Sequence, residues 1–196
     1  MLKVKIIVVG PCQSGKTVIS NFLAEATENS SGKYQPTQGV RILEFESGPV
    51  LVKGRQSRTA VELWDCSGDQ KYELCWPAFS KDAQGVVFVY SPVHKNIYRE
   101  FDLWHSHFVQ SQGLKDAQCV VFCHRKSSAS GEGHVSQLSP QFSRINWVST
   151  IIDDHDDGGK GGEQLKQEFS KFLERLLNAV NERHDQEELS IIGHER

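Results

Sequence analysis

Long hydrophobic runs are absent from this chain, and its 38% of hydrophobic residues are spread over short segments. Because a membrane-spanning helix needs about 20 consecutive, mostly apolar residues, no such helix is expected. A signal-peptide pattern, a glycine at position 2 and a cysteine in the segment 191–196 are missing as well, so no membrane anchor is expected. The net charge of −3 comes without a Lys/Arg-rich stripe, so neither nucleic acid nor an anionic membrane is expected as a partner.

Paired cysteines are also missing. The chain has five cysteines and no C-x-x-C pair, so neither a disulfide framework nor a structural zinc site is indicated. The five are Cys12, Cys66, Cys75, Cys119 and Cys123. We expect reduced thiols in the core or at a site, which favours a cytoplasmic protein.

Short apolar segments alternate with amphipathic ones, which is typical of βαβ units in one α/β domain. The predicted strands are 2–9, 40–46, 59–65, 85–91, 119–123 and 146–152. Amphipathic helices are expected after the first strand, after the fourth strand and, most clearly, over 165–180. We therefore expect a six-stranded, mostly parallel sheet with one antiparallel hairpin at its edge and helices on both faces. The domain is expected to span 1–184, followed by a polar, disordered tail at 185–196.

The most informative segment is Gly10-Pro11-Cys12-Gln13-Ser14-Gly15-Lys16-Thr17, which fits G-x-x-x-x-G-K-[ST] directly after the first predicted strand. Glycines let the backbone turn so that N–H groups face a phosphate, and a helix beginning near Lys16 adds its positive dipole end. In this pattern Lys16 reaches the β- and γ-phosphates and the Thr17 hydroxyl is a ligand for Mg²⁺. An accidental glycine-rich turn is much less probable in this context. The predicted phosphate-binding residues are Gly10, Cys12, Gln13, Ser14, Gly15, Lys16 and Thr17.

Two further segments have the chemistry that a nucleotide triphosphate requires. Thr37 lies in Tyr34-Gln35-Pro36-Thr37-Gln38-Gly39, a predicted loop in which a threonine can ligate Mg²⁺; the alternative is that Thr37 only begins a strand. In Leu63-Trp64-Asp65-Cys66-Ser67-Gly68, Asp65 is placed to hold a Mg²⁺-bound water, and the Gly68 N–H to contact a γ-phosphate. D-x-x-G alone is weak, but its place behind the other two segments strengthens it.

These three segments, with the last strand's Trp147-Val148-Ser149-Thr150, resemble the Ras/Rab small GTPase superfamily over about residues 1–184. The resemblance implies a Ras-like P-loop G domain that binds GTP and GDP with Mg²⁺. MLKVKIIVVGPCQSGKT and WDCSGDQKYE look more narrowly like the Rab-like five family of small GTPase-like subunits in intraflagellar transport complex B. That match implies a place at the cilium and ciliary base, and a coiled-coil pair of complex B subunits as partners.

The base-recognition segment departs from the family. Where the family has N-K-x-D, this chain has His124-Arg125-Lys126-Ser127, or Arg125-Lys126-Ser127-Ser128 if the strand is one residue longer, and neither register supplies the aspartate that binds guanine. Losing one charged hydrogen bond costs about 1.5–3 kcal/mol, roughly ten- to a hundredfold in affinity. Arg125 or Lys126 can still cover the base, and Ser149 can help position it. We predict a nucleotide site here with reduced selectivity for guanine.

The hydrolytic position also differs. The family's water-orienting glutamine would fall at Asp69, and Gln70 lies one residue beyond it. A shift of one residue is a large geometric error for catalysis, so Asp69 and Gln70 are weak catalytic candidates and slow or absent hydrolysis is predicted.

A partner face is predicted next to the two switch loops, which are the Thr37 loop and the turn that contains Gly68. Period-two alternation places Ile42 and Trp64 on the outer side of their strands, and Tyr72 and Trp76 follow in sequence. Core packing is the alternative, above all for Trp76. Two functions remain open: a GTP-responsive switch, and a pseudo-GTPase adaptor that works independently of nucleotide. An ATP-using P-loop enzyme is disfavoured, because the chain has no separate substrate-binding insertion.

Overall fold

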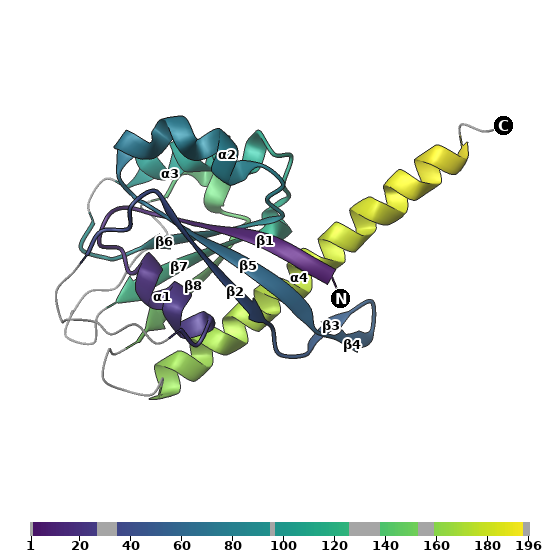
Figure 1. The fold of residues 1–196 in the computed structure, drawn as a ribbon, viewed down its shortest axis with the longest axis horizontal. Helices are drawn as coiled ribbons and strands as arrows, with labels where there is room; N and C mark the ends of the chain where they lie inside the picture. The colour runs from purple at the N-terminus through teal and green to yellow at the C-terminus, as the bar shows by residue number, and fades with distance from the viewer. Residues whose placement is uncertain (1, 27–34, 95–96, 126–137, 153–158, 194–196) are drawn as a thin grey trace.

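A computed structural model describes residues 2–26, 35–94, 97–125, 138–152 and 159–193. Its main sheet has six strands in the order β2-β5-β1-β6-β7-β8 (Figure 1). β2 pairs antiparallel with β5, and every other pair in this sheet is parallel, as predicted. The strands are β1 (Leu2–Val9), β2 (Val40–Glu46), β5 (Thr59–Cys66), β6 (Gly85–Tyr90), β7 (Cys119–Arg125) and β8 (Asn146–Ile151).

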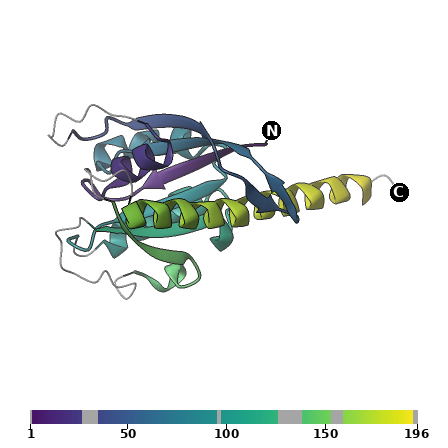
Figure 2. The same ribbon diagram turned by 90° about the horizontal axis from the view of Figure 1, so that it is seen from below.

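Helices cover both faces of the sheet (Figures 1 and 2). On one face lie α1 (Lys16–Leu23) and α4 (Gly159–Gly193). On the other lie α2 (Trp76–Ser80), α3 (Tyr98–Trp104) and the π-helical turn that continues α3, η2 (His105–Gln110). Short 3₁₀ turns are η1 (Gln70–Cys75), η3 (Asp116–Gln118) and η5 (Pro140–Phe142). None of the helices in the described residues is long and apolar enough to cross a membrane.

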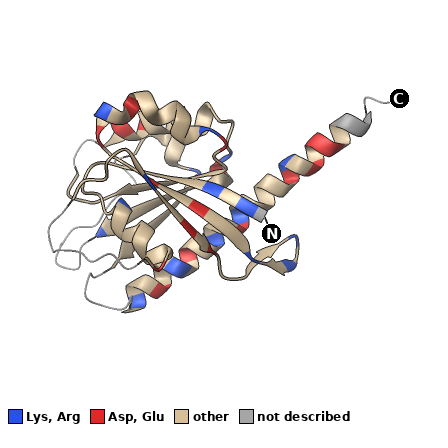
Figure 3. Cartoon of the chain, viewed as in Figure 1, with Lys and Arg blue, Asp and Glu red and all other residues tan. Residues whose placement is uncertain are grey.

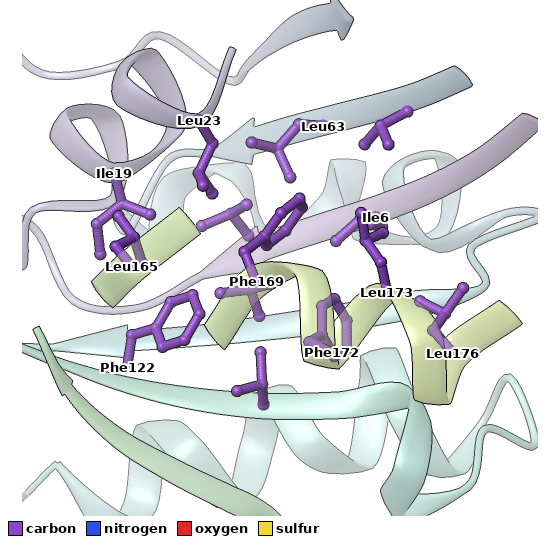
Figure 4. Packing of buried hydrophobic residues seen from close by; sticks show 14 of the residues in the cluster. Ile6, Ile19, Leu23, Leu63, Phe122, Leu165, Phe169, Phe172, Leu173 and Leu176 are labelled. Atoms are coloured by element: carbon purple, nitrogen blue, oxygen red, sulfur yellow. The ribbon is translucent and has the colours of Figure 1, made fainter. Parts of the chain in front are cut away.

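The two cores are separated by the sheet, because successive side chains of a strand point to opposite faces. Under α1 and α4, the strands contribute Ile6, Leu63 and Phe122, which pack on Ile19 and on Phe172 of α4 (Figure 4). On the other face, Phe88 packs against aromatic residues of α3, η2 and η5. Both faces of the central strands are therefore buried, which holds their carboxyl ends in fixed positions at one edge of the sheet.

The predicted antiparallel pair at the sheet edge, β2 with β5, is confirmed. Along the chain between these two strands lies an additional two-stranded sheet of β3 (Val50–Val52) and β4 (Arg55–Ser57). It turns toward α4, where the Asn178 side chain accepts from the backbone N–H of Lys53 at 3.0 Å and donates to the carbonyl of Leu51 at 3.3 Å. Because α4 satisfies these backbone groups, the hairpin tip departs from the main sheet.

The C-terminal segment also differs from expectation. A disordered tail is predicted from residue 185, whereas α4 continues as helix to Gly193 and extends past the sheet (Figures 1 and 3). Charged residues of both signs follow one another there, and Arg183 pairs with Glu187 one turn later at 2.9 Å. Such pairs add about 0.2–0.5 kcal/mol each to an exposed helix. Lys53 of the β3–β4 hairpin also pairs with Asp185 at 2.6 Å.

Candidate nucleotide-binding site

The predicted phosphate loop connects β1 to α1. A Cβ added to Gly10 would lie 1.9 Å from the carbonyl oxygen of Val89, and one added to Gly15 would lie 2.2 Å from Cδ2 of His124. Gly15 also has φ +93°, which L side chains rarely adopt. Both glycines are thus required by close approach, as the motif predicts.

Lys16 lies across this loop and is only 6% exposed. Its Nζ donates hydrogen bonds to the carbonyl oxygens of Gly10 at 2.8 Å and Pro11 at 2.7 Å. Burial lowers the pKa of Lys16, while the nearby Asp65 raises it. A desolvated ammonium at the start of a helix suits a phosphate ligand, because phosphate oxygens satisfy its charge better than carbonyls do.

Three oxygen-bearing side chains from different elements meet beside Lys16. The Thr17 hydroxyl donates to Asp65 Oδ2 at 2.7 Å and lies 3.2 Å from the Thr37 hydroxyl. Hydroxyl and carboxylate oxygens are the ligands that Mg²⁺ prefers. The three predicted metal residues are therefore brought together by the fold, although they are far apart in sequence.

Asp65 is fully buried, and its Oδ1 has no hydrogen-bond partner among the described residues. Burial raises the pKa of Asp65, and the Thr17 hydrogen bond, Lys16 and Arg41 lower it in that order. An unpaired carboxylate oxygen at this place fits an ion's bound water. The residues present therefore fit Mg²⁺, with Thr17 and Thr37 as ligands and Asp65 acting through water.

Gly68 lies directly against the phosphate loop. A Cβ there would come within 2.5 Å of the Cys12 nitrogen and the Gly10 oxygen. The residue before Gly68 connects this turn to the Thr37 loop, because the Ser67 N–H donates a hydrogen bond to the Gly39 carbonyl at 2.8 Å. The structure thus places Gly68 at the phosphate loop, where the D-x-x-G pattern predicts it.

Asp69 is engaged in local structure. Its Oδ1 accepts from the Lys71 backbone N–H at 3.0 Å, and its Oδ2 pairs with Lys71 Nζ at 3.1 Å. The backbone hydrogen bond, followed by the Lys71 side chain, lowers the pKa of Asp69. Asp69 therefore caps η1, and Gln70 is exposed as the first residue of that turn.

At the base end, the carboxyl ends of β7 and β8 are joined by side chains. His124 Nδ1 lies 3.2 Å from the Thr150 hydroxyl, and its ring packs against Gly15. Arg125 Nε and Nη2 donate to the Ser149 hydroxyl at 3.1 and 2.8 Å. His124, Arg125 and Ser149 thus lie together as predicted, while Lys126 and Ser127 fall outside the described residues.

Three predicted loop residues have different environments. Ser14 is 1% exposed and its hydroxyl has no partner among the described residues, which suits a group that would face a ligand. Gln13 is exposed and has φ 62°, a left-handed conformation. Cys12 is exposed, and its carbonyl oxygen lies 3.0 Å from Nε2 of His94, a contact that no sequence pattern indicates.

The predicted partner face is assembled only in part. Ile42 is 47% exposed and opposite Trp64 in the β2–β5 register. Lys5 Nζ lies 3.5 Å from the Trp64 ring centroid, and the Tyr72 hydroxyl donates to Gln38 Oε1 at 2.7 Å.

Trp76 requires a correction. It is 4% exposed, and its ring packs against Phe108 with centroids 5.5 Å apart. Trp76 therefore belongs to the core under α3 and η2, because its place at the start of α2 turns it toward the sheet rather than toward solvent.

Arg41 is a site residue that the motifs miss. It is opposite Asp65 in the β2–β5 register, with Nη2 3.9 Å from Asp65 Oδ2, and it donates a hydrogen bond to Asn21 Oδ1 of α1. The signal in the sequence is its place in the alternation, because Arg41 shares its strand face with Leu43 and Phe45, which pack on the core. A cation on the inward face of a strand indicates a buried anion.

Comparison with known proteins matches this chain to a family model and to named relatives. The family model "Ras of Complex, Roc, domain of DAPkinase" matches residues 5–127. The Intraflagellar transport protein 22 homolog of Macaca fascicularis is 42% identical over 192 residues, which cover 98% of this chain and 100% of that protein.

Solved structures of a trypanosome relative are also similar. The GTP-bound and GDP-bound crystal structures of T. brucei IFT22 are each 26% identical and match with a TM-score of 0.62, covering 89% of this chain and 95% and 96% of theirs. The GTP-bound crystal structure of T. brucei IFT22/74/81 matches at 28% identity and the same TM-score of 0.62, covering 85% of this chain and 93% of that one.

Proposed function

The chain belongs to the intraflagellar transport protein 22 family of Ras-like GTPase domains, and from this premise we propose that it binds GTP and GDP with Mg²⁺ as a subunit of intraflagellar transport complex B. Its place is then the cilium and the ciliary base, in cilium assembly. Hydrolysis is slow or absent.

The observation that carries nucleotide binding is the meeting of Thr17, Thr37 and Asp65 beside the buried Lys16. A nucleotide phosphate would satisfy Lys16 Nζ, and the metal would neutralise phosphate charge and orient the oxygens. Gly68 touches the same loop, so a γ-phosphate would contact both the D-x-x-G turn and, through the metal, the Thr37 loop. A triphosphate therefore has a means to order this surface that a diphosphate lacks.

Slow hydrolysis is supported by Asp69. Its negatively charged carboxylate caps η1 and pairs with Lys71, so both of its oxygens are already engaged within the same turn. We expect Asp69→Gln to raise single-turnover GTP hydrolysis, because a neutral amide can orient water without repelling the γ-phosphate. Unchanged turnover would count against this assignment, and Glu73→Gln in the same 3₁₀ turn is the matched control.

Partners are proposed to be a coiled-coil pair of complex B subunits. The support is the relative whose solved structure is named IFT22/74/81, together with the exposed Ile42 and the half-buried Trp64 beside the switch loops. Partly exposed aromatic residues at such positions anchor protein interfaces. We expect Trp64→Ala to weaken partner binding by about 1–3 kcal/mol while nucleotide affinity is retained.

The experiment has two stages. The first measures the nucleotide carried by purified protein and then its affinity for GTP, GDP and ATP with Mg²⁺. The second compares partner binding of the GTP and GDP forms, with Trp64→Ala and, as a control on the hairpin, Leu51→Ala. Tighter partner binding of the GTP form supports a switch.

A second candidate is a nucleotide-independent pseudo-GTPase adaptor. The missing base-recognition aspartate and the capped Asp69 favour it. A protein that is purified empty, shows no affinity for any of the three nucleotides and still binds its partner would establish this alternative and exclude the switch.

A further inference from the structure

Arg41 places a permanent positive charge at the predicted metal site. Its Nη2 lies 3.9 Å from Asp65 Oδ2, too far for a hydrogen bond but within range of an electrostatic contact. Asp65 is fully buried, so water screens this pair much less than it screens the surface pairs of the sheet. The guanidinium is therefore a counter-charge for a carboxylate that the fold has removed from solvent.

Arg41 also keeps its place by contacts outside the phosphate loop. It lies on β2 opposite Asp65, and its guanidinium donates a hydrogen bond to Asn21 Oδ1 on α1. Lys16, the other cation near Asp65, is bound to the carbonyls of Gly10 and Pro11 and is expected to turn toward a phosphate. Because the contacts of Arg41 lie outside the phosphate loop, we expect it to stay beside Asp65 when nucleotide binds.

We propose that Arg41 is a resident counter-cation of the metal site, which weakens Mg²⁺ binding and makes nucleotide retention less dependent on Mg²⁺. The inference rests on the proposed nucleotide binding. Two cations that neutralise one carboxylate compete, because each reduces the negative potential that attracts the other. By linkage, the loss of Arg41 strengthens the coupling between Mg²⁺ and nucleotide.

The test measures the dissociation constant of each nucleotide, GTP and GDP, in excess Mg²⁺ and in EDTA. The quantity compared is the ratio of the constant in EDTA to the constant in Mg²⁺. We expect Arg41→Gln to raise this ratio about tenfold. Arg41→Lys keeps the charge and should stay near the wild-type ratio. Arg58→Gln is the matched control, because Arg58 pairs with Glu46 at the surface, where both side chains are 65% and 47% exposed.

A second readout needs no nucleotide. In the ligand-free protein Arg41→Gln leaves the buried Asp65 with less counter-charge, so its melting temperature should fall, whereas that of Arg58→Gln should not. If Arg41→Gln does not fold, Asn21→Asp decides the matter. The new carboxylate would pair with Arg41 and neutralise part of its positive charge. Asp65 would then have less counter-charge, so the ratio should rise as well.

The outcomes separate the two proposals. If the wild-type protein binds guanine nucleotide but the ratio is unchanged in folded Arg41→Gln, or in Asn21→Asp in its place, the role of Arg41 is overturned and the proposed function stands. If the wild-type protein binds no nucleotide, both proposals fail together.

Discussion

The phosphate end and the base end of the site differ in how closely they follow the family pattern. At the phosphate end, Lys16, Thr17, Thr37 and Asp65 keep the expected residue types, and Thr17 lies within hydrogen-bond distance of both Thr37 and Asp65. At the base end, the segment has His124 in place of the family's asparagine, and the aspartate is missing. Phosphate and metal binding depend on full charges in one geometry, whereas a base can also be held by packing and stacking, so the base end tolerates replacement more readily than the phosphate and metal contacts.

The two ends also differ in their energetic state. Lys16 and Asp65 are buried ionisable groups. Burial lowers the pKa of Lys16 and raises the pKa of Asp65, and both shifts favour the neutral form of the group. The base-end side chains satisfy one another, because His124 meets Thr150 and Arg125 meets Ser149. The phosphate end is therefore costly for the ligand-free fold and would be stabilised by a ligand, whereas the described side chains of the base end already have partners within the protein.

The largest effect is expected for Lys16→Met. Affinity for GTP, GDP and ATP should fall alike, by roughly a hundredfold or more, because a charge-assisted phosphate contact is lost that does not depend on the base. The ligand-free protein should melt at a higher temperature, since a desolvated ammonium is replaced by an apolar chain. Calorimetric titration and thermal unfolding test this, with the exposed Lys171→Met as control. A loss confined to GTP would contradict the division between the two ends.

Asp65→Asn should lower nucleotide affinity in Mg²⁺ by about tenfold, with little change in EDTA. The raised pKa of Asp65 has a further consequence. The ligand-free fold favours the protonated carboxyl, so the unfolding free energy is greatest at acid pH and falls as the pH rises through that raised pKa. Asn cannot ionise, so the variant should lose this fall and be more stable at neutral pH. Denaturant unfolding across pH measures both profiles, and parallel profiles would refute the expectation.

Gly68→Ala should weaken GTP binding by about tenfold and destabilise the fold by about 1–3 kcal/mol, because its Cβ would clash with backbone atoms of the phosphate loop. Gly48→Ala is the control, since no atom lies within 4 Å of its added Cβ. The control should be neutral or slightly stabilising. Equal effects of the two changes would show that Gly68 does not touch the phosphate loop in solution.

The smallest effect is expected at the base end. Arg125→Ala should lower affinity for GTP and ATP about three- to tenfold each, because a stacking cation contributes roughly 1 kcal/mol to any purine. Ser149→Ala should follow in the same direction and to a smaller extent, since it removes the hydrogen bonds that Arg125 donates to the Ser149 hydroxyl. The exposed Arg144→Ala is the control in competition titrations. A selective loss of GTP would mean that Arg125 reads the guanine edge.

Much of the fold could be predicted because its signals are local. The six main strands were expected to within a few residues, since buried parallel strands have short apolar segments and the phosphate motif marks the first turn. The placement of the β3–β4 hairpin against α4 could not be predicted, because it involves Asn178, which is more than 120 residues away along the chain. The helix beyond residue 184 was missed because its polar composition resembles disorder, although its charges pair at helical spacing.

By itself the sequence determined the fold class, the chemistry of the phosphate end and the departures at Asp69 and the base loop, because these follow from residue types at fixed spacing. Only the tertiary structure decided that Trp76 is core, that Asp69 caps a turn and that Arg41 stands beside Asp65. The physical reason is that burial and charge pairing arise between segments far apart in the chain. The spacing of residues within one segment does not indicate which distant residue will bury a side chain of that segment or neutralise its charge.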